Sequence, residues 1–209
     1  MSRPDPESAV DGEPLEEYLE SARTSRLTGP APSSTHLANA ELFASAVPVG
    51  ASVLDLGSGA GLPGLIVAHL RPDVHMTLLE ASERRCCFLE EWVPRVAPTA
   101  SVLHGRAETL ARDERYRQRF ETVVSRSFGP PAVTAECAAG FLAPGGLLLV
   151  SEPPTEDTDR WPTAGLLRLG LVAEDHLRGL ESGIRLLRCV ASIDAVPRAD
   201  GEPRQRPMF

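Results

Sequence analysis

Short apolar runs alternate with amphipathic segments along most of this chain. Five runs have the length and composition of buried strands: residues 53 to 56, 74 to 79, 100 to 103, 122 to 125 and 147 to 150. Residues 65 to 70 and the segment from Ser82 repeat apolar positions at helical spacing, and Pro94 is expected to end the second of these helices. This alternation predicts an α/β fold with a doubly wound parallel sheet.

Further elements are predicted around and after the fourth strand. Residues 112 to 119 are densely charged and indicate a solvated helix, whereas Pro131 is suited to the first turn of an apolar helix. A Pro-Gly-Gly turn at residues 144 to 146 is expected to lead into the fifth strand. Two later runs, 171 to 177 and 184 to 190, flank a Glu-Ser-Gly turn and predict a closing antiparallel hairpin.

The two ends of the chain lie outside the predicted sheet. Residues 1 to 14 are rich in proline and acids and are expected to be mobile. Residues 15 to 50 contain two amphipathic segments and are expected to form a helical cap. Residues 51 to 195 would then form one α/β domain, and the proline-rich residues 196 to 209 an extended basic tail.

The composition is typical of one globular domain. All 21 basic residues are arginine, and the formal net charge is −8. This balance argues against a surface that coats nucleic acid, although it allows a local basic patch. The sequence has neither a membrane-spanning apolar run nor signal-peptide character at its start, so we expect a cytoplasmic protein without a membrane partner. The four cysteines have no metal-binding spacing, so no metal is expected.

The most informative motif follows the first predicted strand, where residues 53 to 64 read Val-Leu-Asp-Leu-Gly-Ser-Gly-Ala-Gly-Leu-Pro-Gly. Gly57, Gly59 and Gly61 allow a tight turn and a close approach of the backbone to a ligand. The helix that begins directly after this loop would point its free N–H groups at the carboxyl end of the strand. The motif therefore predicts a site for a nucleotide-like cofactor.

Two sequence fingerprints overlap in this motif. Residues 59 to 64 fit the dinucleotide pattern G-x-G-x-x-G, with Glu80 about twenty residues further on as a ribose acid. Residues 55 to 61 fit the acid-x-G-x-G-x-G form of class I methyltransferases, which bind S-adenosylmethionine. The second is favoured, because Asp55 would lie near a cationic methionyl amine but would repel a pyrophosphate. The fold expected is therefore the Rossmann-like class I methyltransferase sheet, with a C-terminal antiparallel hairpin and an N-terminal helical cap.

Several segments resemble the bacterial small-subunit ribosomal RNA methyltransferase G family, also called glucose-inhibited division protein B. The resemblance covers roughly residues 27 to 208. It rests on residues 27 to 30 (Leu-Thr-Gly-Pro), 36 to 39 (His-Leu-Ala-Asn), 55 to 64, 85 to 90, 106 to 108 (Arg-Ala-Glu), 125 to 126 (Ser-Arg) and a tail of form Pro197-Arg198-x-x-Gly201-x-Pro203-x-x-Arg206-Pro207.

The resemblance implies transfer of a methyl group from S-adenosylmethionine to N7 of a guanine in 16S rRNA. N7 has a free lone pair and no proton to lose, so this step needs no general base. The partner would be 16S rRNA or the small ribosomal subunit, and we expect a monomer. The cofactor-binding residues it implies are Asp55, Gly57, Ser58, Gly59, Gly61 and Leu62 around the methionyl end, Glu80 at the ribose, Ala107 and Glu108 at the adenine, and Arg126.

Arg126 and Arg198 are the implied catalytic residues and would face the guanine or its phosphates. His36 either lines the same cleft or packs on the N-terminal helix. Other functions stay open, because the protein is acidic and Glu152 follows the fifth strand where family members carry Lys-Gly. Both observations favour a related methyltransferase acting on a small molecule or another RNA. A third interpretation is a non-catalytic relative that binds S-adenosylmethionine.

Overall fold

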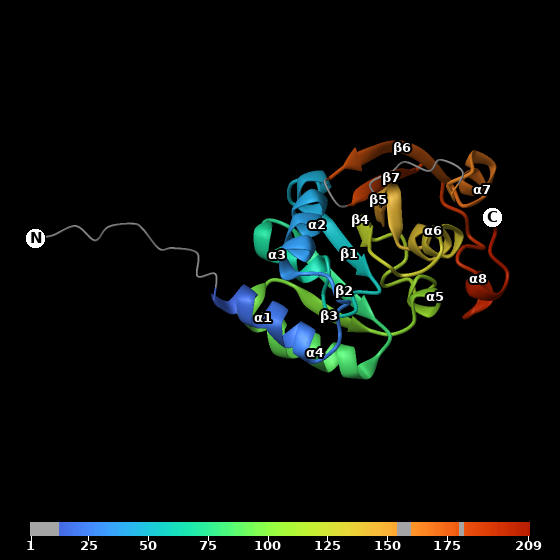
Figure 1. The fold of residues 1–209 in the computed structure, drawn as a ribbon. Coiled ribbons are helices and arrows are strands. Elements are labelled where there is room, and N and C mark those ends of the chain that lie inside the picture. Colours follow the sequence, from blue (N-terminus) through green and yellow to red (C-terminus); the bar gives the residue numbers. More distant parts are fainter. Residues whose placement is uncertain (1–12, 154–159, 180–181) are drawn as a thin grey trace, which may run out of the picture.

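In the computed structural model, which describes residues 13–153, 160–179 and 182–209, one seven-stranded sheet lies between two layers of helices (Figure 1). The strand order is β3-β2-β1-β4-β5-β7-β6. The strands are β1 Ser52–Leu56, β2 His75–Glu80, β3 Ser101–His104, β4 Phe120–Ser125, β5 Leu142–Glu152, β6 Leu171–Arg178 and β7 Gly183–Cys189.

The first five strands are parallel, and β7 runs antiparallel to both β5 and β6. The predicted α/β sheet and its closing hairpin are thus confirmed. Strand order reverses between β1 and β4, which places a crevice at the carboxyl ends of these two strands. The eight helices of the described residues are α1 Glu13–Thr24, α2 Ser33–Ala46, α3 Gly64–Leu70, α4 Glu83–Val96, α5 Ala107–Leu110, α6 Pro131–Ala139, α7 Thr163–Arg168 and α8 Glu202–Gln205.

Two apolar cores lie on opposite faces of the sheet. Side chains of α1 to α4 form one core with Val53 of β1, and side chains of α5 to α7 form the other with Leu54 and Leu56. This alternation follows from the two-residue period of a strand. It also places Asp55 on the same face as Val53, where the N-terminus of α3 covers it.

Three predicted elements were wrong in detail. Residues 112 to 119 form turns rather than a helix, because the segment offers no apolar face and the Asp113 carboxylate accepts a hydrogen bond from the Arg115 backbone. Helix α4 continues past Pro94 to Val96, since the proline lies on the exposed side, where the carbonyl it leaves unbonded can meet water. Strand β5 begins before the predicted turn, with a register shift opposite residues 120 and 122.

The predicted extended tail was also wrong. Residues 202 to 205 form helix α8, after a left-handed backbone conformation at Gly201 (φ 80°). The tail folds back because Arg198 pairs with the buried Glu136 of α6 at 2.6 Å. The predicted mobile N-terminus remains a prediction, because residues 1 to 12 lie outside the described residues. No helix among the described residues is both long and apolar enough to cross a membrane.

Candidate functional site

The glycine loop after β1 has the backbone geometry that its sequence predicts. Gly57, Gly59 and Gly61 have φ angles of 72°, 62° and 98°. A Cβ atom at Gly57 would lie 2.5 Å from the Phe128 ring, and one at Gly61 would lie 2.9 Å from the Cβ of Leu65. Glycine is therefore required at both positions by conformation and by space.

Helix α1 braces this loop through Tyr18. The Tyr18 hydroxyl donates a hydrogen bond to the Ala60 carbonyl at 2.6 Å, and the side chain is fully buried. Burial raises the pKa of Tyr18 far above its usual value, so the hydroxyl keeps the proton that it donates. No sequence pattern points to this residue, because one tyrosine on an amphipathic helix carries no signal of a partner 42 positions away.

Glu80 joins the end of β2 to the glycine loop. Its Oε2 accepts a hydrogen bond from the Gly59 backbone N–H at 2.9 Å, and its Oε1 accepts from the backbones of Ala81 and Ser82, both at 2.8 Å. Arg85 lies 3.7 Å away as an ion-pair partner. Each carboxylate oxygen has two lone pairs, so Oε1 is fully used, whereas Oε2 can still accept one hydrogen bond from a ligand hydroxyl group.

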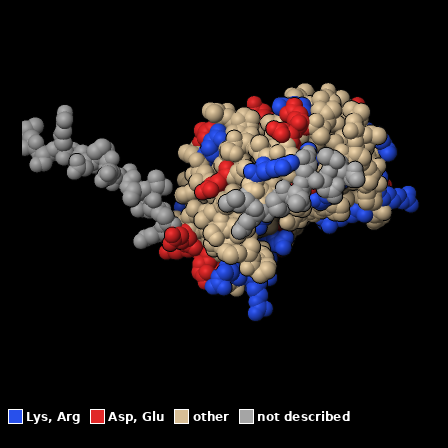
Figure 2. Space-filling view, turned by 45° about the horizontal axis from the view of Figure 1, so that its top comes forward, with Lys and Arg blue, Asp and Glu red and all other residues tan. Residues whose placement is uncertain are grey.

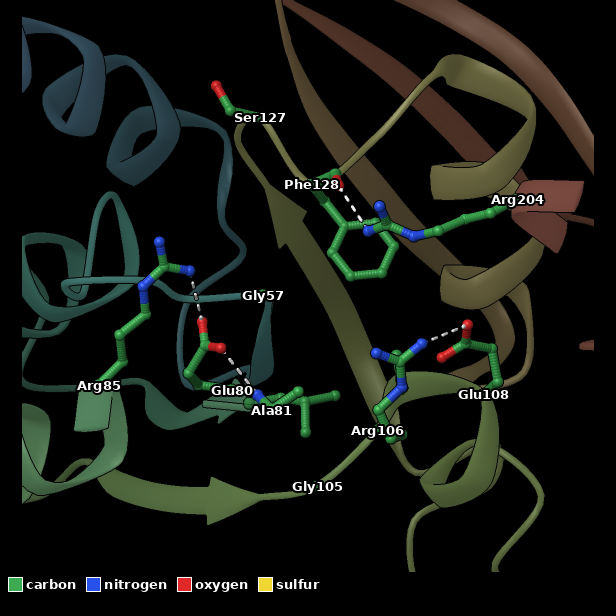
Figure 3. A pocket seen from close by; sticks show the side chains of 12 residues that line it. Gly57, Glu80, Ala81, Arg85, Gly105, Arg106, Glu108, Ser127, Phe128 and Arg204 are labelled. Carbon is green, nitrogen blue, oxygen red and sulfur yellow. Dashed lines mark hydrogen bonds and ion pairs between the residues drawn. The ribbon is translucent and has the colours of Figure 1, made fainter. Parts of the chain in front are cut away.

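A cavity of about 250 Å³ opens beside Glu80 (Figure 3). Glu80 and Arg85 lie on one side of it, and Phe128, Arg204 and Arg106 lie on the other. Its remaining lining residues are Gly57, Leu79, Ala81, Gly105, Ala107, Glu108 and Ser127. An adjoining hollow of about 200 Å³ shares Gly57, Arg85 and Ser127 with the cavity and adds Leu27, Thr28, Gly29, Ser58, Gly59, Ala60, Leu62 and Arg126.

The two hollows together form one groove across the carboxyl ends of β1, β2 and β4. The predicted site residues that line it are Gly57, Ser58, Gly59, Leu62, Glu80, Ala107, Glu108 and Arg126. The groove suits an adenosine, because Glu80 can accept a hydrogen bond from a ribose hydroxyl group and Ala107 offers a small side chain to the base. The glycine loop leaves room for the methionyl chain. The groove therefore fits S-adenosylmethionine.

Asp55 does not line either hollow, contrary to its predicted place beside the methionyl amine. Its side chain is buried against the start of α3, where Oδ2 accepts a hydrogen bond from the Gly64 backbone at 3.0 Å. Oδ1 is buried without a hydrogen-bond partner. Desolvation raises the pKa of Asp55 to about 7. Asp55 thus fixes the turn from the glycine loop into α3.

Arg126 lies at the mouth of the groove and is oriented by His36 of α2. Its Nη2 donates a hydrogen bond to His36 Nδ1 at 2.8 Å. His36 is 3% exposed, and both burial and the nearby Arg126 charge lower its pKa. A neutral imidazole whose Nδ1 accepts from arginine holds the guanidinium toward the groove. His36 was predicted either to line the cleft or to pack on the N-terminal helix. It lines neither hollow, and it lies buried within α2 next to Arg126.

Arg198 does not line the groove, so the structure does not bring the two predicted catalytic arginines together there. Its guanidinium donates to both carboxylate oxygens of Glu136, at 2.8 and 2.6 Å. The tail arginine that reaches the groove is Arg204, whose Nη2 donates to the Phe128 carbonyl at 3.2 Å. No sequence pattern distinguishes Arg204 from the other tail arginines, because only the folded tail brings α8 next to residue 128.

Glu152 is neutralised within the fold. It is 7% exposed, and Oε2 accepts a hydrogen bond from Arg160 Nη1 at 2.6 Å. An internal pair of opposite charges presents little net charge to a substrate. Glu152 therefore gives no support to a small-molecule substrate over RNA. Among residues 13–153, 160–179 and 182–209, no group of three His, Cys, Asp or Glu side chains is placed to hold a metal ion.

Residues 32–156 match the family described as rRNA small subunit methyltransferase G. A protein of that name from Moorella thermoacetica is 32% identical over 171 residues, covering 78% of this chain and 71% of the relative. One from Mycobacterium sp. (strain KMS) is 35% identical, covering 81% and 71%. One from Frankia alni is 43% identical over 116 residues, covering 54% of this chain and 44% of the relative.

Solved structures share the fold at low identity. A putative O-methyltransferase from Klebsiella pneumoniae superposes with a TM-score of 0.60 at 14% identity, over 91% of this chain and 93% of its own. The glycopeptide N-methyltransferase MtfA, complexed with S-adenosylmethionine, superposes with a TM-score of 0.57 at 16% identity, over 75% and 94%. These structures establish the class I methyltransferase fold for this chain.

We expect Gly59→Val to abolish S-adenosylmethionine binding while the protein stays folded. The branched side chain would project from a loop whose backbone lines the groove. Isothermal titration calorimetry with S-adenosylmethionine measures the effect. Gly50→Val is the matched control, because Gly50 has a similar φ of 69° and open space around it but lies outside the groove. Undiminished affinity in a folded Gly59→Val variant would contradict the assignment of the groove.

A second prediction concerns the buried carboxyl of Asp55, whose pKa of about 7 exceeds the unfolded value of about 3.9. Between these values the native state holds a proton that the unfolded chain has lost, so this group lowers the free energy of unfolding as pH rises from 4 to 7. Asp55→Asn removes this dependence. Relative to wild type, the variant should gain stability across that window, by at most roughly 4 kcal/mol.

Urea denaturation at several pH values measures this difference. Asp113→Asn is the control, since Arg115 holds the pKa of Asp113 down to about 2 and this group does not titrate between pH 5 and 7. If the free energies of unfolding of Asp55→Asn and wild type change in parallel from pH 4 to 7, the Asp55 carboxyl is ionised throughout this range and burial does not raise its pKa.

Proposed function

The chain belongs to the rRNA small subunit methyltransferase G family, and we propose that it methylates N7 of a guanine in 16S rRNA. It is a methyltransferase that uses S-adenosylmethionine. The observation that carries the choice of rRNA is the family match over residues 32–156, which contains the glycine loop, Glu80, Glu108 and Arg126. For the same reason we infer that the protein acts on the small ribosomal subunit or its RNA; the monomeric state and the cytoplasmic location stay predictions from the sequence.

We propose the following roles for residues that line the groove. Glu80 would accept a hydrogen bond from a ribose hydroxyl group, while Ala107 and Glu108 would face the adenine. The methionyl chain would lie along Gly57, Ser58 and Gly59, toward the mouth at Arg126. When bound, S-adenosylmethionine supplies a sulfonium-activated methyl group, which is already a strong electrophile.

The chemistry at guanine N7 makes modest demands on the protein. N7 is a hydrogen-bond acceptor with a lone pair and no proton, so its reaction with an electrophile needs no general base. The protein then contributes by positioning the base in line with the methyl group and by excluding water. The segment between β4 and α6 contributes Ser127 and Phe128 to the cavity wall. These two residues are placed to exclude water on that side.

Arg126 is the residue best placed to bind RNA at the mouth. Methylation at N7 leaves the guanine with a positive charge, so a guanidinium directly against the base would oppose the reaction. A phosphate oxygen is therefore the better partner for Arg126, and the hydrogen bond to His36 holds the guanidinium for it. Arg126 would fix the RNA backbone while the base enters the groove.

The acidic composition supports a second candidate, a related methyltransferase that acts on a small molecule or another RNA. The formal net charge is −8, and Figure 2 shows basic and acidic groups interspersed on the visible face without one continuous basic band. RNA binding would then depend on a few arginines near the groove rather than on a wide surface.

Methylation mapping separates the two candidates. We expect 16S rRNA from a strain lacking this protein to lose one N7-methylguanine, detected by chemical cleavage at that base, and regain it when the gene is restored. Purified protein should methylate small ribosomal subunits, with binding that weakens along a shallow log–log slope as salt increases. Unchanged 16S rRNA, together with salt-independent turnover of a compound that is not a nucleic acid, would contradict the rRNA proposal.

We expect Arg126→Ala to separate the cofactor from the RNA. S-adenosylmethionine affinity should change by no more than a few fold, because Glu80 and the glycine loop hold the cofactor, whereas methyl transfer should fall about a hundredfold through loss of RNA positioning. Calorimetry and a labelled-methyl transfer assay measure the two properties. Arg115→Ala removes an exposed arginine that pairs with Asp113, and it should leave both unchanged. Equal losses of binding and transfer would instead place Arg126 in the cofactor site.

A further inference from the structure

The C-terminal tail, residues 197–209, is held by an internal ion pair. Glu136 of α6 is 0% exposed, and Arg198 donates to its carboxylate through the backbone N–H at 3.0 Å as well as through Nε and Nη2. The same Nη2 donates to the Arg206 carbonyl at 2.7 Å. Arg198 therefore ties its own segment and the C-terminal end of α8 to α6. Phe209 adds an apolar anchor against Gly165 of α7.

The anchored tail reaches the cofactor groove at two points. The Gly201 backbone N–H donates to Glu108 Oε1 at 3.3 Å, beside a hydrogen bond of 2.8 Å from Thr109 to Asp200. At the second point, the Arg204 guanidinium lies 5.6 Å from the centroid of the Phe128 ring and donates to the carbonyl of the same residue. In Figure 3 Arg204 enters the cavity from the side opposite Glu80.

Phe128 transmits the second contact to the glycine loop. Its ring packs so closely on Gly57 that a Cβ there would lie 2.5 Å from a ring carbon. Phe128 follows Ser127, which adopts a positive φ of 59°, a conformation that a non-glycine residue keeps only when its surroundings hold it. The Arg204 contacts supply such a restraint. The tail thus contacts Phe128, and Phe128 in turn contacts the glycine loop.

We propose that the C-terminal tail is a structural wall of the S-adenosylmethionine site, in which Arg204 positions Phe128 against the glycine loop and Gly201 positions Glu108. Arg198 and Glu136 are the positioning residues that anchor this wall. The inference rests on the groove being the cofactor site, as in the proposed function. It assigns the tail arginines Arg198 and Arg204 to cofactor binding rather than to RNA.

Cofactor titration without RNA tests the proposal. Arg204→Ala should weaken S-adenosylmethionine affinity about tenfold, since it removes both the cation–π contact and the hydrogen bond to Phe128. Arg204→Lys keeps the charge but not the planar guanidinium, so it should restore only part of the affinity. Arg204 is exposed, and circular dichroism should show that both variants fold as the wild type does.

Arg206→Ala is the matched control. Arg206 carries the same charge in the same tail and is exposed, but it does not line the groove, so affinity should stay within about twofold. Wild-type affinity in Arg204→Ala would overturn the proposal. If wild-type protein itself fails to bind S-adenosylmethionine, the cofactor assignment fails instead, and the two failures are distinguishable.

The coupling between tail and cofactor can also be measured on the tail, by a readout that a change in fold stability alone would not alter. If the folded tail favours cofactor binding, bound cofactor must favour the folded tail. Saturating S-adenosylmethionine should therefore slow tryptic cleavage after Arg198 and Arg204 several-fold, and leave cleavage after Arg115, in a turn away from the groove, unchanged. Equal cleavage of the tail with and without cofactor would contradict the coupling.

Discussion

The hydrogen bond from the Gly59 backbone to the Glu80 carboxylate is the interaction on which the geometry of the site depends. It joins the ends of β1 and β2 and holds the glycine loop in conformations that few other residues adopt. Tyr18 supports the same loop from α1, and Phe128 supports it from the segment after β4. Three segments distant in sequence thus shape one backbone turn, and the cofactor groove is the space that the turn leaves.

Buried carboxylates recur throughout this fold, and most of them have a positive or N–H partner. Glu136 binds Arg198, Glu152 binds Arg160, and Glu80 accepts three backbone N–H groups. The Glu–Arg pairs among them already sum to zero in the formal net charge of −8, so their burial leaves the remaining surface as acidic as the composition suggests. An RNA would therefore have to bind through local basic groups near the groove rather than through the overall charge of the protein.

The sheet and the cofactor loop could be predicted from the sequence because their signals are local. Apolar runs of strand length, amphipathic helices and the motif at residues 53 to 64 each reflect the physics of neighbouring residues. The sequence also predicts that Glu80 and Arg126 lie near this loop, since the carboxyl ends of parallel strands meet at one edge of a sheet. The errors at Pro94 and residues 112 to 119 arose where exposure and turn hydrogen bonds, rather than periodicity, decide the local structure.

Only the tertiary structure decided which side chains face the groove. Asp55 lies in the right motif, but the pleat of β1 turns it beneath α3, and its carboxyl caps that helix. In the sequence alone, Arg198 and Arg204 are equivalent tail arginines. In the folded protein Arg198 anchors the tail on the buried Glu136, and Arg204 reaches Phe128. Tyr18 and His36 act through partners 42 and 90 positions away. A sequence specifies its local conformations directly, but contacts between distant residues exist only once the packing of both cores has fixed where each element lies.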